Sequence, residues 1–171
     1  MKKMVVVMGC LLGWGGLLSA DTGVAQINGT TANSTISGIV TLVDTPAGLK
    51  VLAQLNGVPA GSHGFHIHEL GLCTDSGKAA GGHYNPENTE HGMVMKEGVH
   101  HAHAGDMGNI VAGADGKATL EVVLPEITLT GGKYPVAGRA IILHEKTDDF
   151  GQPVGNAGGR IGCGAIVLSG K

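Results

Sequence analysis

Aromatic residues are scarce in this chain, at only 3% of 171 residues, whereas hydrophobic residues make up 42%. A core of Val, Ile, Leu and Ala is therefore expected, and this apolar content argues against a disordered chain. Basic residues are too few for a nucleic-acid-binding surface, since the net charge is −3. A membrane span needs about 20 apolar residues, so we expect none in the mature chain. Small molecules are the expected partners.

Sustained helical periodicity is also missing, and glycine is abundant instead, with 31 copies and no collagen-like period. This excess indicates tight turns in a loop-rich all-β protein. Alternating and apolar runs predict strands at 36–42, 49–55, 110–114, 118–124, 140–143 and 165–168. Asp115-Gly116 predicts a hairpin turn. The predicted fold is an immunoglobulin-like Greek-key β-sandwich or barrel of about eight antiparallel strands, with long metal-binding loops.

The N-terminus has the pattern of an export signal. Two lysines precede an apolar, uncharged run from Met4 to Leu18, and small residues suited to cleavage follow at 18–20 and 23–25. We therefore expect a periplasmic or secreted protein. Lipoprotein anchoring at Cys10 is the alternative, which the continuing apolar run disfavours. The predicted division is a signal peptide at 1–25, a flexible leader at 26–33 and one domain at 34–171.

Cysteine is also rare, and removal of the signal leaves two of the three copies, Cys73 and Cys163. An exported chain meets an oxidising compartment, so we predict a disulfide between them. The bond would close a loop of about ninety residues and contribute on the order of 4–5 kcal/mol as an upper figure. Two buried free thiols are the alternative.

Histidine carries the functional signal, with nine copies in the chain. His66 and His68 are one residue apart in a strand-like run, so their side chains leave the same face. Phe65 and Ile67 leave the opposite face. The pair can therefore bind a metal from one side while the other side packs into a core, although an ordinary, partly exposed histidine pair has the same spacing.

A second ligand set follows in a long loop between Gly71 and Gly105, where the strand pattern lapses. Loops of this length in a compact domain are usually functional. Three imidazoles and a carboxylate suit a closed tetrahedral Zn²⁺ site: His83, His91, His103 and Asp106. Nitrogen ligands alone fit Cu(II) and its one-electron chemistry: His66, His68 and His144.

Five fragments occur in this order: HGFHIHE, GGHYNP, HAGDMGN, HEKTDD and GNAGGRIGCG. With the strands between them, they closely resemble the copper/zinc superoxide dismutases over about residues 34–170. The resemblance implies an enzyme that converts the superoxide anion to oxygen and hydrogen peroxide with copper and zinc as cofactors. It implies copper at His66, His68, His83 and His144, and zinc at His83, His91, His103 and Asp106. His83 would bridge both metals as an imidazolate.

The resemblance also assigns roles to other residues. Asp148 matches a carboxylate that links a copper histidine to a zinc histidine, here His66 and His91. Arg160 matches the guanidinium that guides the anion, so His83 and Arg160 are the predicted catalytic residues. Cys73 and Cys163 match the family's disulfide. Without the resemblance, Asp148 would be a solvated loop acid and Arg160 a surface charge.

Three histidines and one loop stand apart from these roles. His63 matches a position that packs structurally, so we expect no metal there. His100 and His101 are not family ligands; they offer zinc an alternative register or only decorate the loop, and we favour the second. The segment 149–159 is short and contains no lysine. Weaker electrostatic steering of the substrate is therefore expected.

Two function classes compete. The first is an exported superoxide dismutase. The second is a non-catalytic exported module that binds copper and zinc for buffering or delivery, for which Arg160 would be unnecessary. The ligand set with Arg160 favours the enzyme. The sequence leaves open whether the protein is a monomer or a homodimer.

Overall fold

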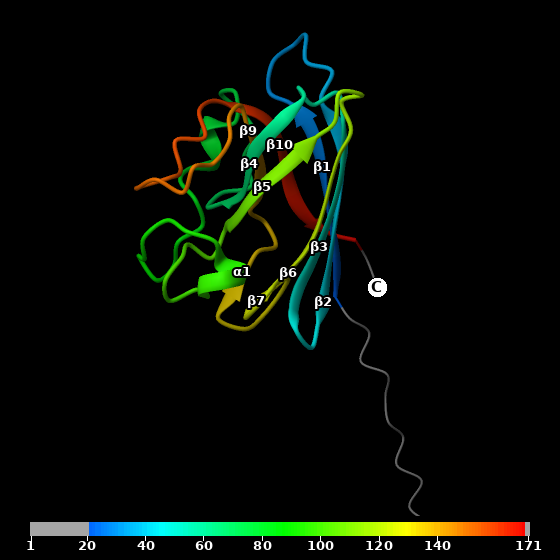
Figure 1. Cartoon of the computed structure of the whole chain (residues 1–171). Coiled ribbons are helices and arrows are strands. Elements are labelled where there is room, and N and C mark those ends of the chain that lie inside the picture. The colour runs from blue at the N-terminus through cyan, green and yellow to red at the C-terminus, as the bar shows by residue number, and fades with distance from the viewer. Residues whose placement is uncertain (1–20, 170–171) are drawn as a thin grey trace, which may run out of the picture.

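An eight-stranded antiparallel barrel forms the body of the protein in a computed structural model that describes residues 21–169 (Figure 1). Its strands are β1 Thr22–Gly29, β2 Ser37–Thr45, β3 Gly48–Asn56, β4 Gly61–His68, β5 Asp106–Ala112, β6 Ala118–Leu124, β9 Ala140–His144 and β10 Arg160–Leu168. A short parallel pair and two single-turn helices lie in the connections: β7 Ile127–Thr128, β8 Tyr134–Pro135, η1 Lys78–Ala80 and α1 Val94–Glu97.

The order of strands around the barrel is β1-β10-β9-β4-β5-β6-β3-β2, and β2 pairs with β1 to close it. Neighbours that are distant in sequence, such as β4 with β9 and β3 with β6, give it Greek-key connections. Within residues 21–169, closure leaves no free barrel edge for another chain to extend. The predicted all-β class with about eight antiparallel strands is confirmed.

The barrel interior is aliphatic, as the composition predicts. On β2 and β3, alternate side chains such as Val40 and Val51 are fully buried, whereas Ile39, next to Val40 on β2, is 49% exposed. This alternation is the two-residue period of a strand with one face in the core. Phe65 is the one phenylalanine in the core cluster of the described chain. The predicted hairpin is also present, since Ala112 pairs with Ala118.

The N-terminal boundary differs from the predicted division. Strand β1 begins at Thr22 and runs through residues assigned to the signal peptide and then to a flexible leader. Val24 pairs with Thr41 on one side and with Val167 on the other, and Ala25 and Ile27 are fully buried. Residues 22–29 therefore belong to the barrel. The remainder of the predicted signal peptide, residues 1–20, lies outside the described residues.

A chain that begins at Gln26 should be less stable than one that begins at Asp21. The shorter chain loses the first half of β1, which pairs on both edges, and each ladder hydrogen bond contributes about 1 kcal/mol. We expect the free energy of unfolding, measured in urea, to fall by about 3 kcal/mol. Equal unfolding midpoints and slopes for the two chains would contradict the place of β1 in the barrel.

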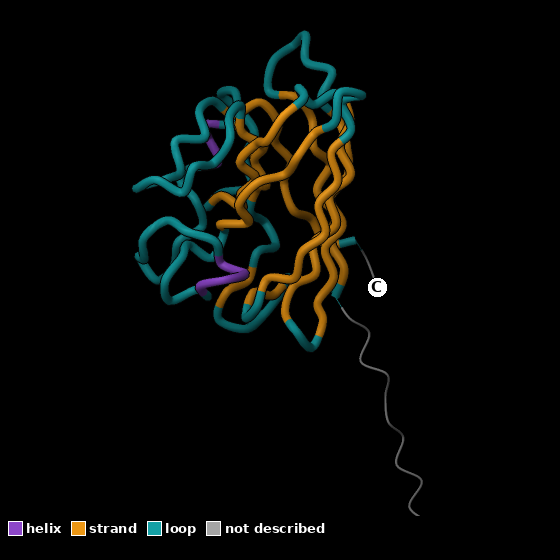
Figure 2. The backbone as a smooth tube through the Cα atoms, in the orientation of Figure 1, coloured by secondary structure: helices purple, strands orange, loops and turns teal. Residues whose placement is uncertain are grey.

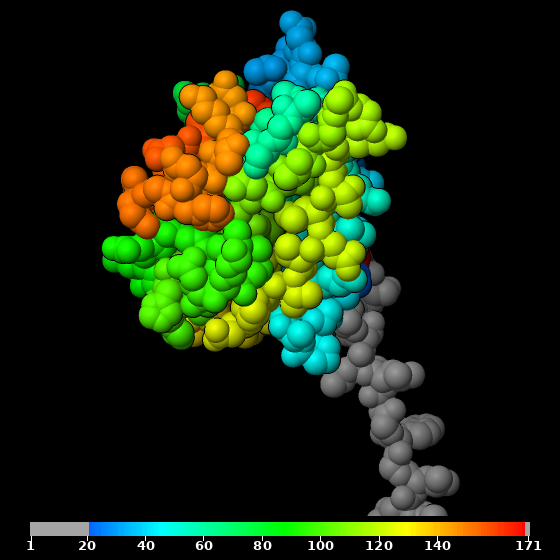
Figure 3. Space-filling view, viewed as in Figure 1, coloured from blue at the N-terminus to red at the C-terminus, as the bar shows by residue number. Residues whose placement is uncertain are grey.

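Two long connections flank the histidine-bearing strands. Residues 69–105 join β4 to β5, and residues 145–159 join β9 to β10. These loops gather on the same flank of the barrel, as the teal segments at the left of Figure 2 show. Their surfaces adjoin in the space-filling view, green beside orange (Figure 3). Within residues 21–169, no helix has the length and apolar character needed to cross a membrane.

Candidate metal centre

Strand β4 presents His66 and His68 on its outer face. Phe65 and Ile67, which alternate with them, belong to the barrel core, and all four side chains are fully buried. The strand lies between β5 and β9, so ladder hydrogen bonds on both edges fix its backbone. The loops cover the histidine face, because His68 forms a bridge with His83 of the first loop. The predicted division of β4 into two faces is confirmed.

Four imidazole rings converge on this outer face. One nitrogen of each lies within 4.8 Å of the others in the group that we name the first ligand group: His66, His68, His83 and His144. The Nε2 atoms of His68 and His144 are 3.3 Å apart. His68 Nδ1 donates a hydrogen bond to the Gly81 carbonyl at 3.1 Å, which leaves the lone pair on Nε2.

Burial keeps three of these rings uncharged by lowering their pKa values. It lowers the pKa of His66 to about 4, that of His68 to about 2 and that of His144 to about 3. A neutral imidazole has a free lone pair for a metal ion. A set of four imidazole nitrogens suits Cu(II).

A second ligand group surrounds the buried carboxylate of Asp106: His83, His91, His103 and Asp106. The Nδ1 atoms of His83 and His91 each lie 2.8 Å from an Asp106 oxygen, and His103 Nδ1 lies 3.1 Å away. Burial alone would raise the pKa of Asp106, but the three imidazoles hold it far below its usual range. Three nitrogens and one carboxylate oxygen are a donor set for tetrahedral Zn²⁺.

His83 belongs to both groups. Its Nδ1 faces Asp106 and lies 3.5 Å from His103 Nδ1, so this edge of the ring serves the second group. The ring centre lies 4.2 Å from that of His66 and 4.9 Å from that of His68. Because the two ring nitrogens point in different directions, Nε2 is the atom available to the first group.

Buried nitrogens without hydrogen-bond partners show that both groups fit metal ions. His66 Nδ1 and His91 Nδ1 are inaccessible to solvent and unpaired among the described residues. His91 Nδ1 lies close to Asp106 Oδ2 but outside hydrogen-bonding geometry. An unpaired buried polar atom costs about 1–3 kcal/mol. A cation among the converging lone pairs of each group would satisfy these atoms.

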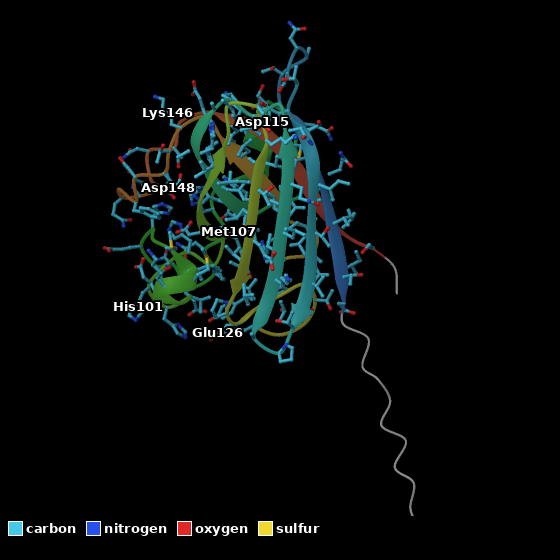
Figure 4. The ribbon with its side chains drawn as sticks, turned by 45° about the vertical axis from the view of Figure 1, so that its right-hand side comes forward. His101, Met107, Asp115, Glu126, Lys146 and Asp148 are labelled. Carbon is cyan, nitrogen blue, oxygen red and sulfur yellow. A yellow bond between two sulfur atoms is a disulfide. The ribbon has the colours of Figure 1, made fainter. Side chains whose placement is uncertain are left out.

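The Asp148 carboxylate connects the two groups, because it forms a hydrogen bond with one histidine of each. One carboxylate oxygen accepts a hydrogen bond from His66 Nε2 at 2.8 Å, and the other accepts one from His91 Nε2 at 2.9 Å. These bonds place the proton of each ring on Nε2 and leave Nδ1 for a metal. Figure 4 shows Asp148 in the loop after β9, on the same flank of the barrel as the loop with His101.

Three further residues support this link, and sequence reasoning missed them. Asn109 holds the Asp148 backbone with two hydrogen bonds, at 2.8 and 2.9 Å. Gln152 holds the His91 backbone in the same manner, with 2.9 Å bonds to its N–H and its carbonyl. Gly155 has φ 74°, and a Cβ there would overlap the Asp148 carboxylate. No local pattern marks these contacts; only the presence of Asn109 and Gly155 in the quoted fragments HAGDMGN and GNAGGRIGCG offered a signal.

Arg160 lies beside the first group, in a cavity of about 180 Å³ that is also lined by His68, His83 and His144. Its guanidinium donates hydrogen bonds to the carbonyls of Gly77 at 2.7 Å and Gly81 at 2.6 Å. The loop that supplies these carbonyls is bonded to β10 by a disulfide between Cys73 and Cys163, which is confirmed.

A sequence profile of the copper/zinc superoxide dismutase family matches residues 36–166. The chain belongs to this family. Membership supports a superoxide dismutase-type function and the binding of copper and zinc. The crystal structure of the clock protein EA4 is also similar: it is 34% identical in sequence, with a TM-score of 0.76, over 90% of this chain and 98% of that chain.

The remaining histidines lie outside both ligand groups of this family member. His63 is buried, and its two ring nitrogens face the carbonyls of His144 and Pro59 at 2.9 and 2.8 Å. His100 and His101 are exposed, and His101 lies at the outer edge of its loop in Figure 4. The prediction that His63 packs structurally agrees with these contacts. The role of His100 and His101 is not assigned.

Proposed function

We propose that this chain dismutates superoxide with copper in the first ligand group and zinc in the second, bridged by His83. The observation that carries the proposal is the position of His83: it belongs to both groups and lines the cavity that contains Arg160. A metal store needs neither a shared imidazole nor a cation beside its ligands. The two groups would hold copper with four nitrogens and zinc with three nitrogens and an oxygen.

The protein residues have separate tasks in this proposal. Bound copper supplies the one-electron cycle that oxidises one superoxide to oxygen and reduces the next to hydrogen peroxide. Arg160 attracts the anion and orients it toward the first group. His83 Nε2 would hold a proton in the half of the cycle in which it does not ligate copper, and would give it to the reduced substrate, which would take its second proton from water. Asp148 keeps His66 and His91 oriented throughout.

The alternative is an exported module that binds copper and zinc without catalysis. The similar structure is named as a clock protein and not as an enzyme, so we retain this alternative. The Arg160 side chain discriminates the two, because a cation beside a copper site disfavours metal uptake and favours an anionic substrate.

Superoxide consumption by the copper- and zinc-loaded chain tests the proposal. Arg160→Ala should lower the second-order rate about tenfold or more with both metals retained. His83→Ala should abolish nearly all activity, whereas His100→Ala, a histidine in the same loop but outside both groups, should keep it. Metal content is measured on every variant. An inactive wild type with full copper and zinc would defeat the enzyme and favour the metal-binding module.

Substrate steering should be weak and should come from outside the 149–159 loop. Lys78 and Arg160 line a cavity of about 590 Å³, which adjoins the site without containing a ligand of either group. We expect Lys78→Gln to lower the rate about twofold at low salt and to have no effect at high salt. Lys117→Gln, an exposed cation on the β5–β6 hairpin, is the control. A wild-type rate that falls steeply with rising salt would contradict weak steering.

We also propose that the protein is exported and acts in the periplasm or outside the cell. The disulfide supports this location, because such bonds persist in oxidising compartments. The superoxide anion is the proposed partner, with no nucleic acid. The molecular mass in solution, measured by light scattering of the purified chain, distinguishes a monomer from a homodimer.

A further inference from the structure

Two cavities meet at His83. One is the cavity of about 180 Å³ that contains Arg160, which we name the copper-side cavity. The other has a volume of about 490 Å³, and we name it the zinc-side cleft. Its lining includes Glu69, His83, Glu90, His103, Gln152 and Val154. His83 and Val154 are the residues common to both. One imidazole therefore has a separate opening on each side.

The two openings carry opposite charge. Arg160 lines the copper-side cavity, and no acidic residue of the described chain joins it there. The zinc-side cleft instead has the carboxylates of Glu69 and Glu90, and no lysine or arginine within residues 21–169 lines it. Both glutamates are exposed. The copper-side cavity thus favours an anion, whereas the zinc-side cleft favours a divalent cation, for which carboxylate and amide oxygens are ligands.

The inner end of the zinc-side cleft is the second ligand group. His83 and His103, each 6% exposed, are the members of that group that line the cleft. His91 and Asp106 lie deeper, at 4% and 0% exposure. His91 Nδ1 has no hydrogen-bond partner among the described residues and lies 2.8 Å from Asp106 Oδ2, so the buried side of the second group offers a cation one nitrogen and one oxygen.

Gln152 closes this inner end. Its side chain lines the cleft and forms 2.9 Å hydrogen bonds with both the N–H and the carbonyl of His91. The amide thus connects the lining of the cleft to the backbone of His91. Rotation of one exposed side chain would free the His91 backbone without moving a barrel strand.

We propose that the zinc-side cleft is the route by which Zn²⁺ reaches and leaves the second ligand group. Glu69 and Glu90 raise the local concentration of cations at its mouth, and Gln152 is the latch at its inner end. Superoxide uses the other opening, so metal exchange and substrate binding do not compete. This inference rests on the proposed zinc site.

Cobalt uptake tests the role of the glutamates. Co²⁺ is added to zinc-depleted, copper-loaded protein, and its visible absorption in the second group is followed in time. Glu69→Gln with Glu90→Gln should slow uptake about threefold or more at low salt, with a smaller difference at high salt. Asp115→Asn with Glu126→Gln removes two exposed carboxylates outside the cleft and should leave the rate unchanged. Equal rates in the cleft variant and wild type would overturn the route.

Zinc release tests the latch. The loaded protein is mixed with excess chromophoric chelator, and Gln152→Ala should release zinc about tenfold faster than wild type. Gln54→Ala, an exposed glutamine on β3, is the matched control. Release at the wild-type rate from Gln152→Ala would overturn the latch.

An equilibrium titration separates this inference from the proposed function. Wild type that binds one Zn²⁺ per chain, with rates that respond to the cleft variants, supports both. Binding of one equivalent with unresponsive rates overturns only the route. Failure of wild type to bind zinc at all would overturn the zinc site and the route together.

Discussion

Replacement of both Cys73 and Cys163 by serine is expected to lower the free energy of unfolding by about 2–5 kcal/mol. The disulfide spans 90 residues, so its loss frees a long loop in the unfolded chain. The same change should lower the rate of superoxide consumption, because Gly77 and Gly81, which hold Arg160, lie in the loop that the bond anchors. Urea unfolding and the second-order rate are the two measurements.

Reduced wild type is the matched control for this double variant, since it lacks the bond but retains both sulfur atoms. The two proteins should lose stability by similar amounts. If the variant unfolds within about 1 kcal/mol of oxidised wild type, the chain-entropy contribution assigned to the bond is wrong.

Gly155→Ala should lower zinc affinity about 10- to 100-fold, the range found when residues that orient metal ligands are lost. A Cβ at this position would overlap the Asp148 carboxylate and lie 2.6 Å from His91 Nε2. Asp148 must therefore move, and its hydrogen bonds to His66 and His91 are lost together. Competition with a chelator of known affinity measures the effect.

Gly138→Ala is the matched control for backbone strain. Gly138 has φ 80°, close to the 74° of Gly155, but a Cβ there would meet nothing within 4 Å. The control should show the cost of a left-handed alanine, about 1 kcal/mol in stability, with zinc affinity intact. Equal zinc affinities in the two variants would contradict the role of Gly155 in positioning Asp148.

Much of the barrel was predictable because strands with one buried face have a two-residue period. Val40 and Leu42 on β2 and Leu49 and Val51 on β3 follow it closely, and each is fully buried. Ligand chemistry predicted two groups, one of nitrogens alone and one with a carboxylate, but the place of His83 in both groups followed only from the family resemblance. The structure brings together the residues expected of both groups.

Strand β1 was not predictable in the same way. Its inward positions include Gly23 and Ala25, whose side chains are too small to register as an apolar stripe. Gly23 is small for a packing reason, since a Cβ there would lie 2.9 Å from the Leu129 side chain. Because the export pattern adjoins these residues, they were assigned to the signal peptide.

Hydrogen bonds between residues that are distant in sequence could not be predicted either. Gln152 holds the backbone of His91, 61 residues away, and Asn109 holds that of Asp148. Such hydrogen bonds leave no local period or spacing, because each depends on where two loops meet. The choice of ring nitrogen in His83 has the same origin, since it follows from the position of Asp106.

The pairing of β1 with β10 sets the order in which the chain can mature. Val24 and Val167 are neighbours in the barrel although nearly the whole domain separates them in sequence. The barrel therefore closes only after the last strand has been synthesised, and such distant contacts make folding slow. Under the proposed export, this delay would leave the chain unfolded for longer before it crosses the membrane.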